Sequence, residues 1–232
     1  MIIKDVKISL LRLPYREQPA LSAGYDKDRE VLVVEIETAS GIVGLGYQLY
    51  LREGFRTTKA CLEEMMIPRI LGKDASSVEA IWRDLWSVTL ADGRGGAPLL
   101  ALSAIDVALW DVVGQKAGLP LHRLWGHYRS EVPIYGSGCW RGLGGDGMAA
   151  KAERFVGEGY KAIKMQVGHI WTDAEDCANV RQMRDTVGPD VDIMVDVNMA
   201  WTADKAILMG RKFEESEIYW LEEPVVPDDF HG

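Results

Sequence analysis

The second half of the sequence contains three strand-like segments, each of which ends in charged or amide side chains. They cover residues 160–167, 191–198 and 218–223, and helical patterns separate them. Strict alternation of strand and helix predicts parallel strands that are joined by right-handed crossovers. In a parallel α/β barrel the active site lies at the carboxyl ends of the strands, where these polar side chains fall. The pattern therefore predicts part of such a barrel, with a site at one end of its sheet.

Strand parity predicts which of these polar side chains meet, because alternate residues of a strand face opposite sides. Apolar residues occupy one face, which is expected to pack on helices. The other face carries Lys164 and Gln166 in the first segment, Asp196 and Asn198 in the second, and Glu222 in the third. We expect one lysine and two carboxylates to converge near the mouth of the barrel.

Asp196 and Glu222 offer hard oxygen donors. Such donors suit Mg²⁺, which takes carboxylates in near-octahedral geometry and keeps positions for water or substrate oxygens. The alternative is that acidic residues at strand ends cap the following helices or form surface ion pairs, which is the better interpretation for a single such residue. Three strands that agree in phase and position favour the metal site instead. We therefore predict that Asp196 and Glu222 bind Mg²⁺.

Length and composition limit the class of protein. With 232 residues, of which 47% are hydrophobic, the chain can bury a sizeable core as one large domain or two modest ones. The amino terminus has no charged segment before a long apolar run, and no uninterrupted apolar stretch approaches membrane-spanning length. We therefore expect a cytoplasmic protein without a membrane partner. Cys61, Cys139 and Cys177 are widely spaced and odd in number, which predicts free thiols rather than disulfides or a zinc site.

The net charge of -9 opposes binding to the phosphate backbone of nucleic acid, because no basic cluster offsets it. An acidic protein that binds an anionic substrate needs a local cation. The predicted Mg²⁺ and Lys164 supply that charge, so a small carboxylate is a compatible substrate.

The first half of the chain is organised differently, with strands before helices. Partly alternating β-branched patterns predict antiparallel strands at residues 2–13, 30–37 and 41–48. Helices are predicted at residues 57–70, 77–86 and 98–117, and Gly118-Leu119-Pro120 ends the last one. After a strand at 132–138, further helices are expected at 147–158, 172–187 and 203–215. The fold class predicted is an α+β N-terminal cap domain at residues 1–128, followed by an α/β domain at residues 129–232.

Several short motifs follow one another in a fixed order. AIDVALWD at residues 104–111 continues through GLPL at 118–121 to LWG at 124–126, and GYKAIK at 159–164, MVDVN at 194–198 and WLEEP at 220–224 follow. In order and spacing the chain resembles the enolase superfamily, specifically its mandelate racemase and muconate lactonizing enzyme-like branch. The first group is similar to the family's helix and turn between cap and barrel. The other three are similar to its second, third and fourth barrel strands.

The resemblance implies an N-terminal cap that closes over a modified TIM barrel, of which this chain holds the first half, strands 1 to 4 only. It also implies that Mg²⁺ stabilises an enediolate, formed by removal of the proton α to a carboxylate. Two negative charges on one carboxyl carbon require a divalent cation and a nearby ammonium. By resemblance Asp196 and Glu222 hold the metal. Lys164, the first lysine of the family's Lys-x-Lys pair, lies against the substrate carboxylate.

One departure from the family pattern is Gln166, which stands where the second lysine normally acts as acid or base. A glutamine can donate or accept a hydrogen bond but takes no proton at neutral pH. Chemistry on one face of the α carbon follows, and it favours dehydration of an acid sugar to a 2-keto-3-deoxy acid. The alternative is a racemase or epimerase of a 2-hydroxy acid whose base comes from elsewhere. Lys161 is a poor replacement, because its place at the start of the strand directs it to solvent near the bottom of the barrel.

A second departure is length. The chain stops at Gly232, just after the fourth barrel strand, whereas the family's third acidic ligand and its Asp/His base pair lie on later strands. Four parallel strands cannot close a barrel and leave two unpaired edges. We therefore expect a truncated reading frame, a fragment or one part of an assembly, and a homo-oligomer for the full-length protein. A further alternative is a catalytically incompetent fragment or an interaction partner.

Other polar residues near the expected site have two interpretations each. Asn198 is expected either to bind substrate or to support the metal ligands. Glu223 faces outward by parity, which favours a salt bridge or a supporting role over direct ligation of the metal. Trp140 and Arg141, just after the first barrel strand, are candidate contacts for an anionic substrate. The alternative for this pair is a packed aromatic ring beside a solvated arginine.

The remaining motifs are weaker. Four histidines show no metal-ligand spacing and are expected to be structural or at the surface, namely His122, His127, His169 and His231. Residues 142–145 lack the ending of a phosphate loop and are predicted to form a flexible turn. Residues 15–29 are predicted to be a lid whose contacts set substrate identity.

Overall fold

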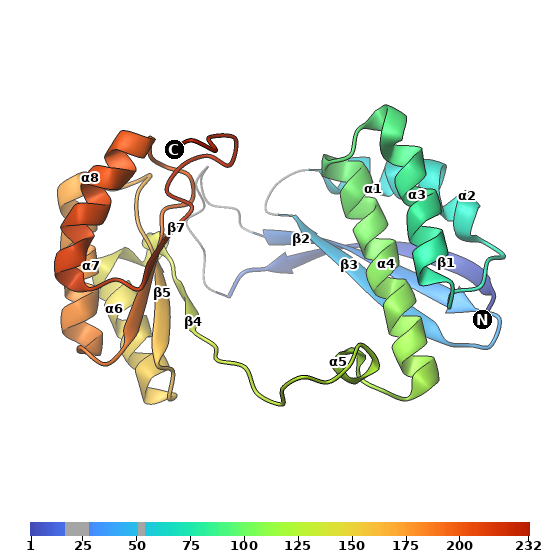
Figure 1. The fold of residues 1–232 in the computed structure, drawn as a ribbon, viewed down its shortest axis with the longest axis horizontal. Coiled ribbons are helices and arrows are strands. Elements are labelled where there is room, and N and C mark those ends of the chain that lie inside the picture. Colours follow the sequence, from blue (N-terminus) through green and yellow to red (C-terminus); the bar gives the residue numbers. More distant parts are fainter. Residues whose placement is uncertain (17–27, 51–53) are drawn as a thin grey trace. The chain divides into compact units, whose positions relative to one another are not determined.

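The computed structural model of the protein describes residues 1–16, 28–50 and 54–232 (Figure 1). The described residues form two compact units, of which the first extends to Ser130 and the second begins at Glu131. Each unit has its own hydrophobic core.

The first unit has a sheet that is followed by helices. Its elements are β1 (Ile3–Pro14), β2 (Asp28–Thr38), β3 (Val43–Tyr50), α1 (Phe55–Ala60), a π-helical segment at Cys61–Met66, α2 (Ile67–Ile70), α3 (Val78–Asp92), α4 (Gly96–Ala117) and α5 (Leu121–Leu124). The second unit alternates strands and helices. Its elements are β4 (Gly136–Cys139), a 3₁₀ turn at Arg141–Leu143, α6 (Gly144–Gly157), β5 (Ala162–Gln166), α7 (Asp173–Val187), β6 (Asp192–Asp196), α8 (Ala203–Phe213), a second 3₁₀ turn at Glu214–Ser216 and β7 (Trp220–Glu222).

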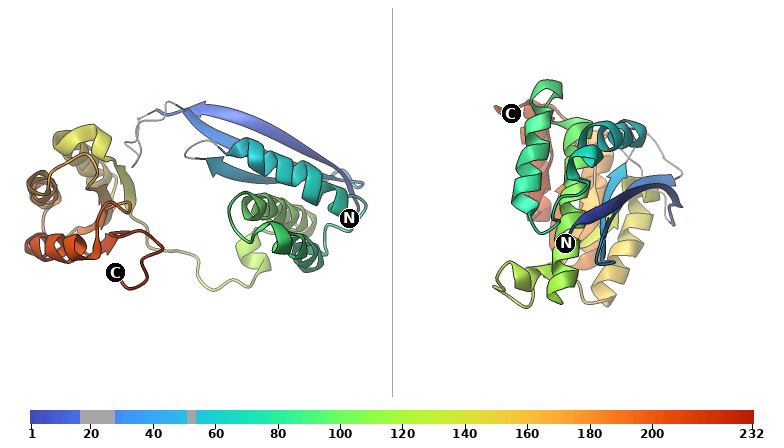
Figure 2. Two further views of the ribbon diagram at one scale, coloured as in Figure 1. Left: turned by 90° about the horizontal axis from the view of Figure 1, so that it is seen from above. Right: turned by 90° about the vertical axis from the view of Figure 1, so that its right-hand side faces the viewer.

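The sheet of the first unit is antiparallel, in the order β1-β2-β3, and helices cover one of its faces (Figure 2). Alternation on β2 produces the covered face, because Leu32, Val34 and Ile36 are fully buried there. Helix α4 packs on β3 at two glycines, Gly44 and Gly46. The helix and the strand can approach this closely only because neither glycine has a side chain.

Helix α4 is the central helix of the first unit, and it confirms the helix predicted at residues 98–117. It ends at Gly118, whose φ of 64° is left-handed and whose N–H bonds to the Gln115 carbonyl. With 22 residues it is long and apolar enough to cross a membrane by length and composition alone. Its buried residues instead belong to the core of the unit, among them Ala104, Ile105 and Ala108.

The second unit is built on a parallel sheet in the order β4-β5-β6-β7, as the alternating pattern predicted. Its apolar face packs on α6, α7 and α8, which lie on one side of the strands in Figure 1. The fully buried residues on this face are Ile163, Met165, Ile193 and Val195 in the strands, and Val167 and Val197 directly after them. The parity expected from the sequence is therefore confirmed for this face, which leaves the opposite face for the polar residues.

Several predicted boundaries differ from the structure. The strand expected at 132–138 begins only at Gly136, which pairs with Ile163 near the start of β5, and Val132 and Ile134 before it are exposed. The turn expected at 142–145 was wrong in part, because these residues complete a 3₁₀ turn and begin α6. Helix α3 continues beyond the expected residue 86 to Asp92, since Gly93 is the first position with positive φ. Of the predicted lid, residues 17–27 lie outside the described residues.

Candidate functional site

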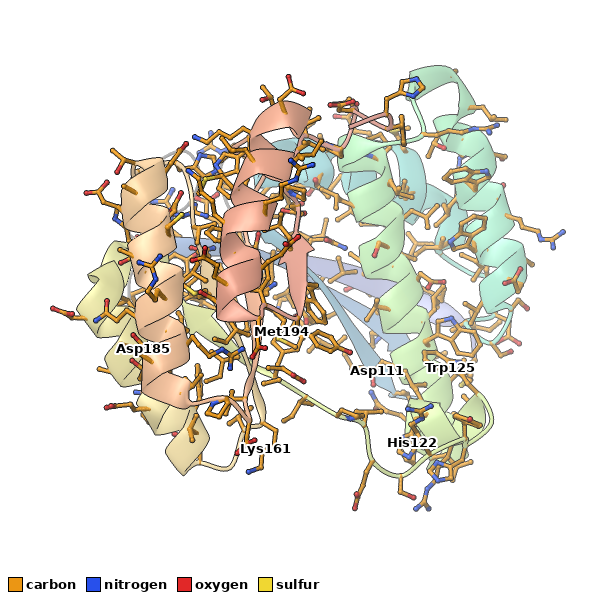
Figure 3. The ribbon with its side chains drawn as sticks, turned by 60° about the vertical axis from the view of Figure 1, so that its left-hand side comes forward. Asp111, His122, Trp125, Lys161, Asp185 and Met194 are labelled. Atoms are coloured by element: carbon orange, nitrogen blue, oxygen red, sulfur yellow. The ribbon has the colours of Figure 1, made fainter. Side chains whose placement is uncertain are left out.

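The candidate site lies at the carboxyl ends of three neighbouring strands. In the parallel register Gln166 of β5 is level with Asp196 of β6, which is level with Glu222 of β7. Lys164 lies two residues before Gln166 on the same face of β5, and it is level with Met194, which is labelled in Figure 3. Because alternate residues share a face, these side chains form two adjacent layers on the side of the sheet away from the helices.

The ammonium of Lys164 lies between two carboxylates. Its Nζ donates to Glu222 Oε1 at 2.5 Å and is 3.5 Å from Asp196 Oδ2. The side chains of Lys164 and Asp196 are only 15% and 9% exposed. Burial by itself would lower the pKa of Lys164, but the hydrogen bond to Glu222 and the two negative charges outweigh it and raise the pKa. Lys164 is therefore a permanent positive charge at neutral pH.

Each carboxylate has one oxygen that protein donors bind and one that faces the ammonium. Asp196 Oδ1 accepts from the backbone N–H of Asn198 at 3.0 Å and from its side-chain amide at 2.8 Å. Glu222 Oε2 accepts from the indole N–H of Trp220 at 3.1 Å. The remaining oxygens, Asp196 Oδ2 and Glu222 Oε1, converge on the Nζ of Lys164.

Asn198 connects the acidic pair to the other polar residues of the site. Its Oδ1 accepts from the guanidinium of Arg141 (Nη2) at 2.7 Å and from the amide of Gln166 (Nε2) at 2.9 Å. The backbone N–H of Arg141 also lies 3.4 Å from Gln166 Oε1. Both ends of the Gln166 amide are thus held, and the Asn198 amide has its oxygen towards Arg141 and its nitrogen towards Asp196.

The residues that follow the strands adopt left-handed backbone conformations. After β6, Asn198 and Met199 have φ values of 50° and 63°, and after β7 Glu223 has a φ of 44°. Non-glycine residues in this region carry strain of about 1–3 kcal/mol each. The turn after β6 directs the Asn198 amide back to Asp196, and the carbonyl of Glu223 accepts from the Met199 N–H at 2.7 Å.

The chemistry of the donor set fits a hard divalent cation. Two carboxylate oxygens face one point, which the positively charged Nζ of Lys164 occupies. Carboxylate oxygens are the donors that a hard divalent cation takes. Within the described ranges, no set of three or more His, Cys, Asp or Glu side chains is placed to hold a metal. The described chain therefore contributes at most a pair of acidic ligands, Asp196 and Glu222, to such a site.

Other predicted site residues lie at the margins. Trp140 is half-buried at the start of the 3₁₀ turn after β4, and its substrate contact stays a prediction. Lys161 is exposed just before β5, at the opposite end of that strand from the site (Figure 3). Glu223 is exposed, and His169 is also exposed, with its Nε2 2.8 Å from the carbonyl oxygen of Asn198.

Three residues in or near the site were not assigned to it from the sequence. The ring of Tyr135 lies 5.7 Å from Lys164 Nζ, and Trp220 binds Glu222. Trp220 shares the inward parity of Glu222, so parity could have identified it. Asp176 in the first turn of α7 is completely buried, and its Oδ1 accepts from the backbone N–H of Gly168 after β5. No sequence pattern distinguishes Asp176 from an ordinary acidic residue at a helix start.

An α+β unit followed by parallel strands that carry a lysine and two carboxylates at their carboxyl ends defines the cap-and-barrel class of the enolase superfamily. The model of the mandelate racemase / muconate lactonizing enzyme N-terminal domain matches residues 7–126, and that of the enolase C-terminal domain-like family matches residues 147–232. The chain belongs to this superfamily, in its mandelate racemase / muconate lactonizing enzyme branch. The predicted fold class is thereby confirmed.

Two curated relatives illustrate the similarity. The 3,6-anhydro-alpha-L-galactonate cycloisomerase of Streptomyces coelicolor is 36% identical over 232 residues, which are 100% of this chain and 64% of the relative. The L-talarate/galactarate dehydratase of Salmonella typhimurium is 32% identical over 238 residues, covering 99% of this chain and 59% of the relative. The chain thus spans about three fifths of the length of these relatives.

Solved structures agree with this grouping. A crystal structure described as a racemase from Streptomyces coelicolor A3(2) with bound magnesium has a TM-score of 0.93 and 36% identity, covering 98% of this chain and 64% of that one. The Salmonella typhimurium dehydratase, liganded with Mg and L-lyxarohydroxamate, has a TM-score of 0.91 and 30% identity, covering 99% and 60%. Magnesium is therefore the metal in both of these relatives.

Proposed function

We propose that the full-length protein is a Mg²⁺-dependent acid-sugar dehydratase. It removes the proton α to the carboxylate of a sugar acid and eliminates the β-hydroxyl as water, which leaves a 2-keto-3-deoxy acid. The observation that carries this proposal is the convergence of Asp196 Oδ2 and Glu222 Oε1 on one positive charge, with Gln166 level with both carboxylates.

The acidic pair and Lys164 have separate roles in this proposal. Asp196 and Glu222 hold the magnesium ion, which supplies charge neutralisation for a substrate carboxylate that becomes doubly negative. The ammonium of Lys164 adds a second positive charge beside that carboxylate and remains protonated, because its pKa is raised. Such fixed charges lower the energy of the enediolate relative to the substrate, and this difference makes the α proton removable.

Gln166 determines which outcome is favoured. Its amide is held by Asn198 and by the backbone N–H of Arg141, so it can hydrogen-bond a substrate but cannot remove a proton. A single face of the α carbon then has access to a base, and by family resemblance that base lies on barrel strands beyond β7. With one base, expulsion of a β-oxygen is favoured over return of a proton to the other face.

The relatives support this chemistry in their own substrates. The Salmonella typhimurium relative is a dehydratase of L-talarate and galactarate, and its structure holds Mg together with L-lyxarohydroxamate. A sugar acid is accordingly the substrate class that we propose for this chain. We also propose that the full-length protein is a homo-oligomer, which size-exclusion chromatography with light scattering would test.

The proposal is tested by incubating the full-length protein with a panel of aldonic and aldaric acids in the presence of Mg²⁺. The expected product is a 2-keto acid, measured as its semicarbazone, and its formation should stop when the metal is chelated. Asp196→Asn is the inactive control, and Asp185→Asn on the exposed side of α7 is the matched active one. Racemisation of a substrate without loss of water would reject the dehydratase.

A second candidate is a cycloisomerase, favoured by the 36% identity to the cycloisomerase of Streptomyces coelicolor. It begins with the same proton removal, but the oxygen that leaves is part of a ring, so no water is released. Incubation of an anhydro or lactone substrate in D₂O distinguishes the two. Product of unchanged composition that carries deuterium supports cycloisomerisation. Exchange of the α proton without net conversion supports the racemase alternative instead.

A further inference from the structure

Two oppositely charged side chains are buried next to residues that follow β5 and β6. Arg141 follows β4 and is 1% exposed, and Asp176 lies in the first turn of α7 and is 0% exposed. A buried charge is unfavourable unless an opposite charge and hydrogen bonds compensate it. What each of these groups binds therefore needs an explanation.

Part of the hydrogen-bonding capacity of the two groups is satisfied. Arg141 donates from Nη2 to Asn198 Oδ1 at 2.7 Å, and Asp176 Oδ1 accepts from the Gly168 N–H at 2.9 Å. Among the described residues, Arg141 Nε, Arg141 Nη1 and Asp176 Oδ2 have no hydrogen-bond partner. These atoms are complementary, because the first two are donors and the third is an acceptor.

The two charges also stabilise each other. Burial lowers the pKa of Arg141 and raises that of Asp176, and in both cases the opposite charge acts against the effect of burial. Buried polar groups in proteins are almost always hydrogen-bonded, and ordered water serves this purpose where no side chain reaches.

We propose that Arg141 is a positioning residue: its guanidinium, joined to the carboxylate of Asp176 through buried water, fixes the amide of Asn198 and thereby the carboxylate of Asp196. The inference rests on the proposed function in one respect, which is that Asp196 binds the metal. It replaces the expected direct contact between Arg141 and substrate, because a side chain with 1% exposure presents almost no surface to a ligand.

The orientation of the Asn198 amide explains how this positioning works. Arg141 and Gln166 both donate to its oxygen, so the amide nitrogen must point towards Asp196 Oδ1. A flipped amide would place its oxygen against the carboxylate and its nitrogen against two donors. Held in the observed orientation, Asn198 occupies Oδ1 of Asp196 and leaves Oδ2 free for a cation.

The first test uses metal-free protein and needs no activity. In ¹⁵N-labelled full-length protein, the side-chain amide of Asn198, assigned with an Asn198→Asp variant, should exchange slowly with solvent. Arg141→Met should accelerate this exchange at least tenfold. Arg181→Met is the matched control, because Arg181 is an exposed arginine on α7 that should leave Asn198 unchanged. Unchanged Asn198 exchange in folded Arg141→Met overturns the proposal.

The second test measures the Mg²⁺ affinity of the same variants by calorimetry. Loss of a residue that orients a metal ligand typically weakens metal binding about 10–100-fold, which is the loss expected for Arg141→Met. If this variant does not fold, Asp176→Asn carries both tests, because it keeps the shape of Asp176 but removes its charge. Folded Asp176→Asn with wild-type exchange and affinity overturns the pairing, as does a high-resolution crystal structure without ordered water between the two groups.

The two proposals fail in different ways. A full-length protein that dehydrates no sugar acid but shows the Arg141-dependent protection of Asn198 contradicts only the proposed function. If the protein is an active dehydratase but Arg141→Met changes neither the exchange rate of the Asn198 amide nor the Mg²⁺ affinity, only the positioning role is contradicted.

Discussion

Lys164 on β5 donates to Glu222 on β7 at 2.5 Å although β6 lies between these strands. The ammonium reaches across β6 and passes within 3.5 Å of Asp196 on the way. The lysine therefore neutralises the two oxygens that we propose as metal ligands. In this proposal lysine and metal compete for the same two oxygens, and the expected effects of substitutions at the site follow from that competition.

Lys164→Met should separate metal binding from catalysis. The variant loses the ammonium that competes for Asp196 and Glu222, so Mg²⁺ should bind at least as tightly as to the wild-type protein. Loss of one group that stabilises developing charge typically lowers kcat about 10²–10³-fold, and a decrease of that size is expected. Calorimetry and steady-state kinetics of the full-length protein measure the two effects. Lys161→Met, at the exposed residue just before β5, is the control. An unchanged kcat would remove the role assigned to Lys164.

Asp196→Asn should have the opposite effect on metal binding. The substitution keeps the shape of the side chain but removes one of two charged donors. Loss of a residue that only supports a ligand weakens metal binding about 10–100-fold, and the Mg²⁺ affinity should fall by more than that here. Activity should be lost with the metal. Calorimetric titration is the measurement, with Asp185→Asn as the control, and retained affinity would contradict the assignment of Asp196 as a ligand.

Asp176 should make stability depend on pH. Burial raises its pKa from 3.8 to about 6; the Gly168 hydrogen bond, Lys205 and Arg141 oppose this rise, and Asp173 adds to it. The folded protein keeps this proton at pH values where the unfolded chain has lost it. The contribution of Asp176 to the free energy of unfolding is therefore complete below pH 4 and is lost as the pH rises through about 6. For a shift of two pK units the free energy of unfolding decreases by about 3 kcal/mol.

Asp176→Asn should remove this contribution. Urea unfolding at several pH values between 4 and 7 measures how steeply the free energy of unfolding falls as the pH rises. This slope should be flatter in the variant than in the wild-type protein. Asp185→Asn, exposed on the same helix, should keep the wild-type slope. Equal slopes in Asp176→Asn and the wild-type protein would show that the buried carboxyl does not titrate in this range.

The contact between β3 and α4 should not tolerate a side chain at Gly46. A Cβ at this position would overlap the carbonyl oxygen of Ala104, and both atoms belong to regular elements that cannot easily move. Gly46→Ala should lower the free energy of unfolding by at least about 2 kcal/mol, towards the upper end for overpacked cores. Gly157→Ala, which has open space in α6, should instead be neutral or stabilising by up to about 1 kcal/mol. Chemical denaturation compares the two, and equal stabilities would refute the close approach.

The sequence was sufficient to predict that Lys164, Asp196 and Glu222 converge, because strand parity and a parallel sheet place inward side chains at one edge. It was not sufficient to predict the hydrogen bonds that occupy one oxygen of each carboxylate and leave the other oxygen facing the ammonium of Lys164. Those bonds depend on the left-handed turn at Asn198 and on the 3₁₀ turn that begins at Arg141, whose guanidinium binds Asn198. Neither turn has a residue pattern of its own, and residues 142–145, which overlap the 3₁₀ turn, were expected to form a flexible turn.

The residue at which β4 begins could not be predicted from the sequence either. Val132 and Ile134 alternate as strand residues do, but β5 provides no partner before its own first residues, so they remain outside the sheet. Periodicity describes which face a residue prefers. Whether a neighbouring backbone is present to pair with it is a property of the tertiary structure.

The left-handed backbone of Asn198 has a consequence for any effort to make this protein more resistant to heat. Glycine would relax the backbone there, yet it would delete the amide that binds Asp196, Arg141 and Gln166 and would leave these buried groups without those partners. Relief of backbone strain at position 198 would therefore cost both folding stability and the geometry of Asp196, so this position should be left out of any search for heat-resistant variants.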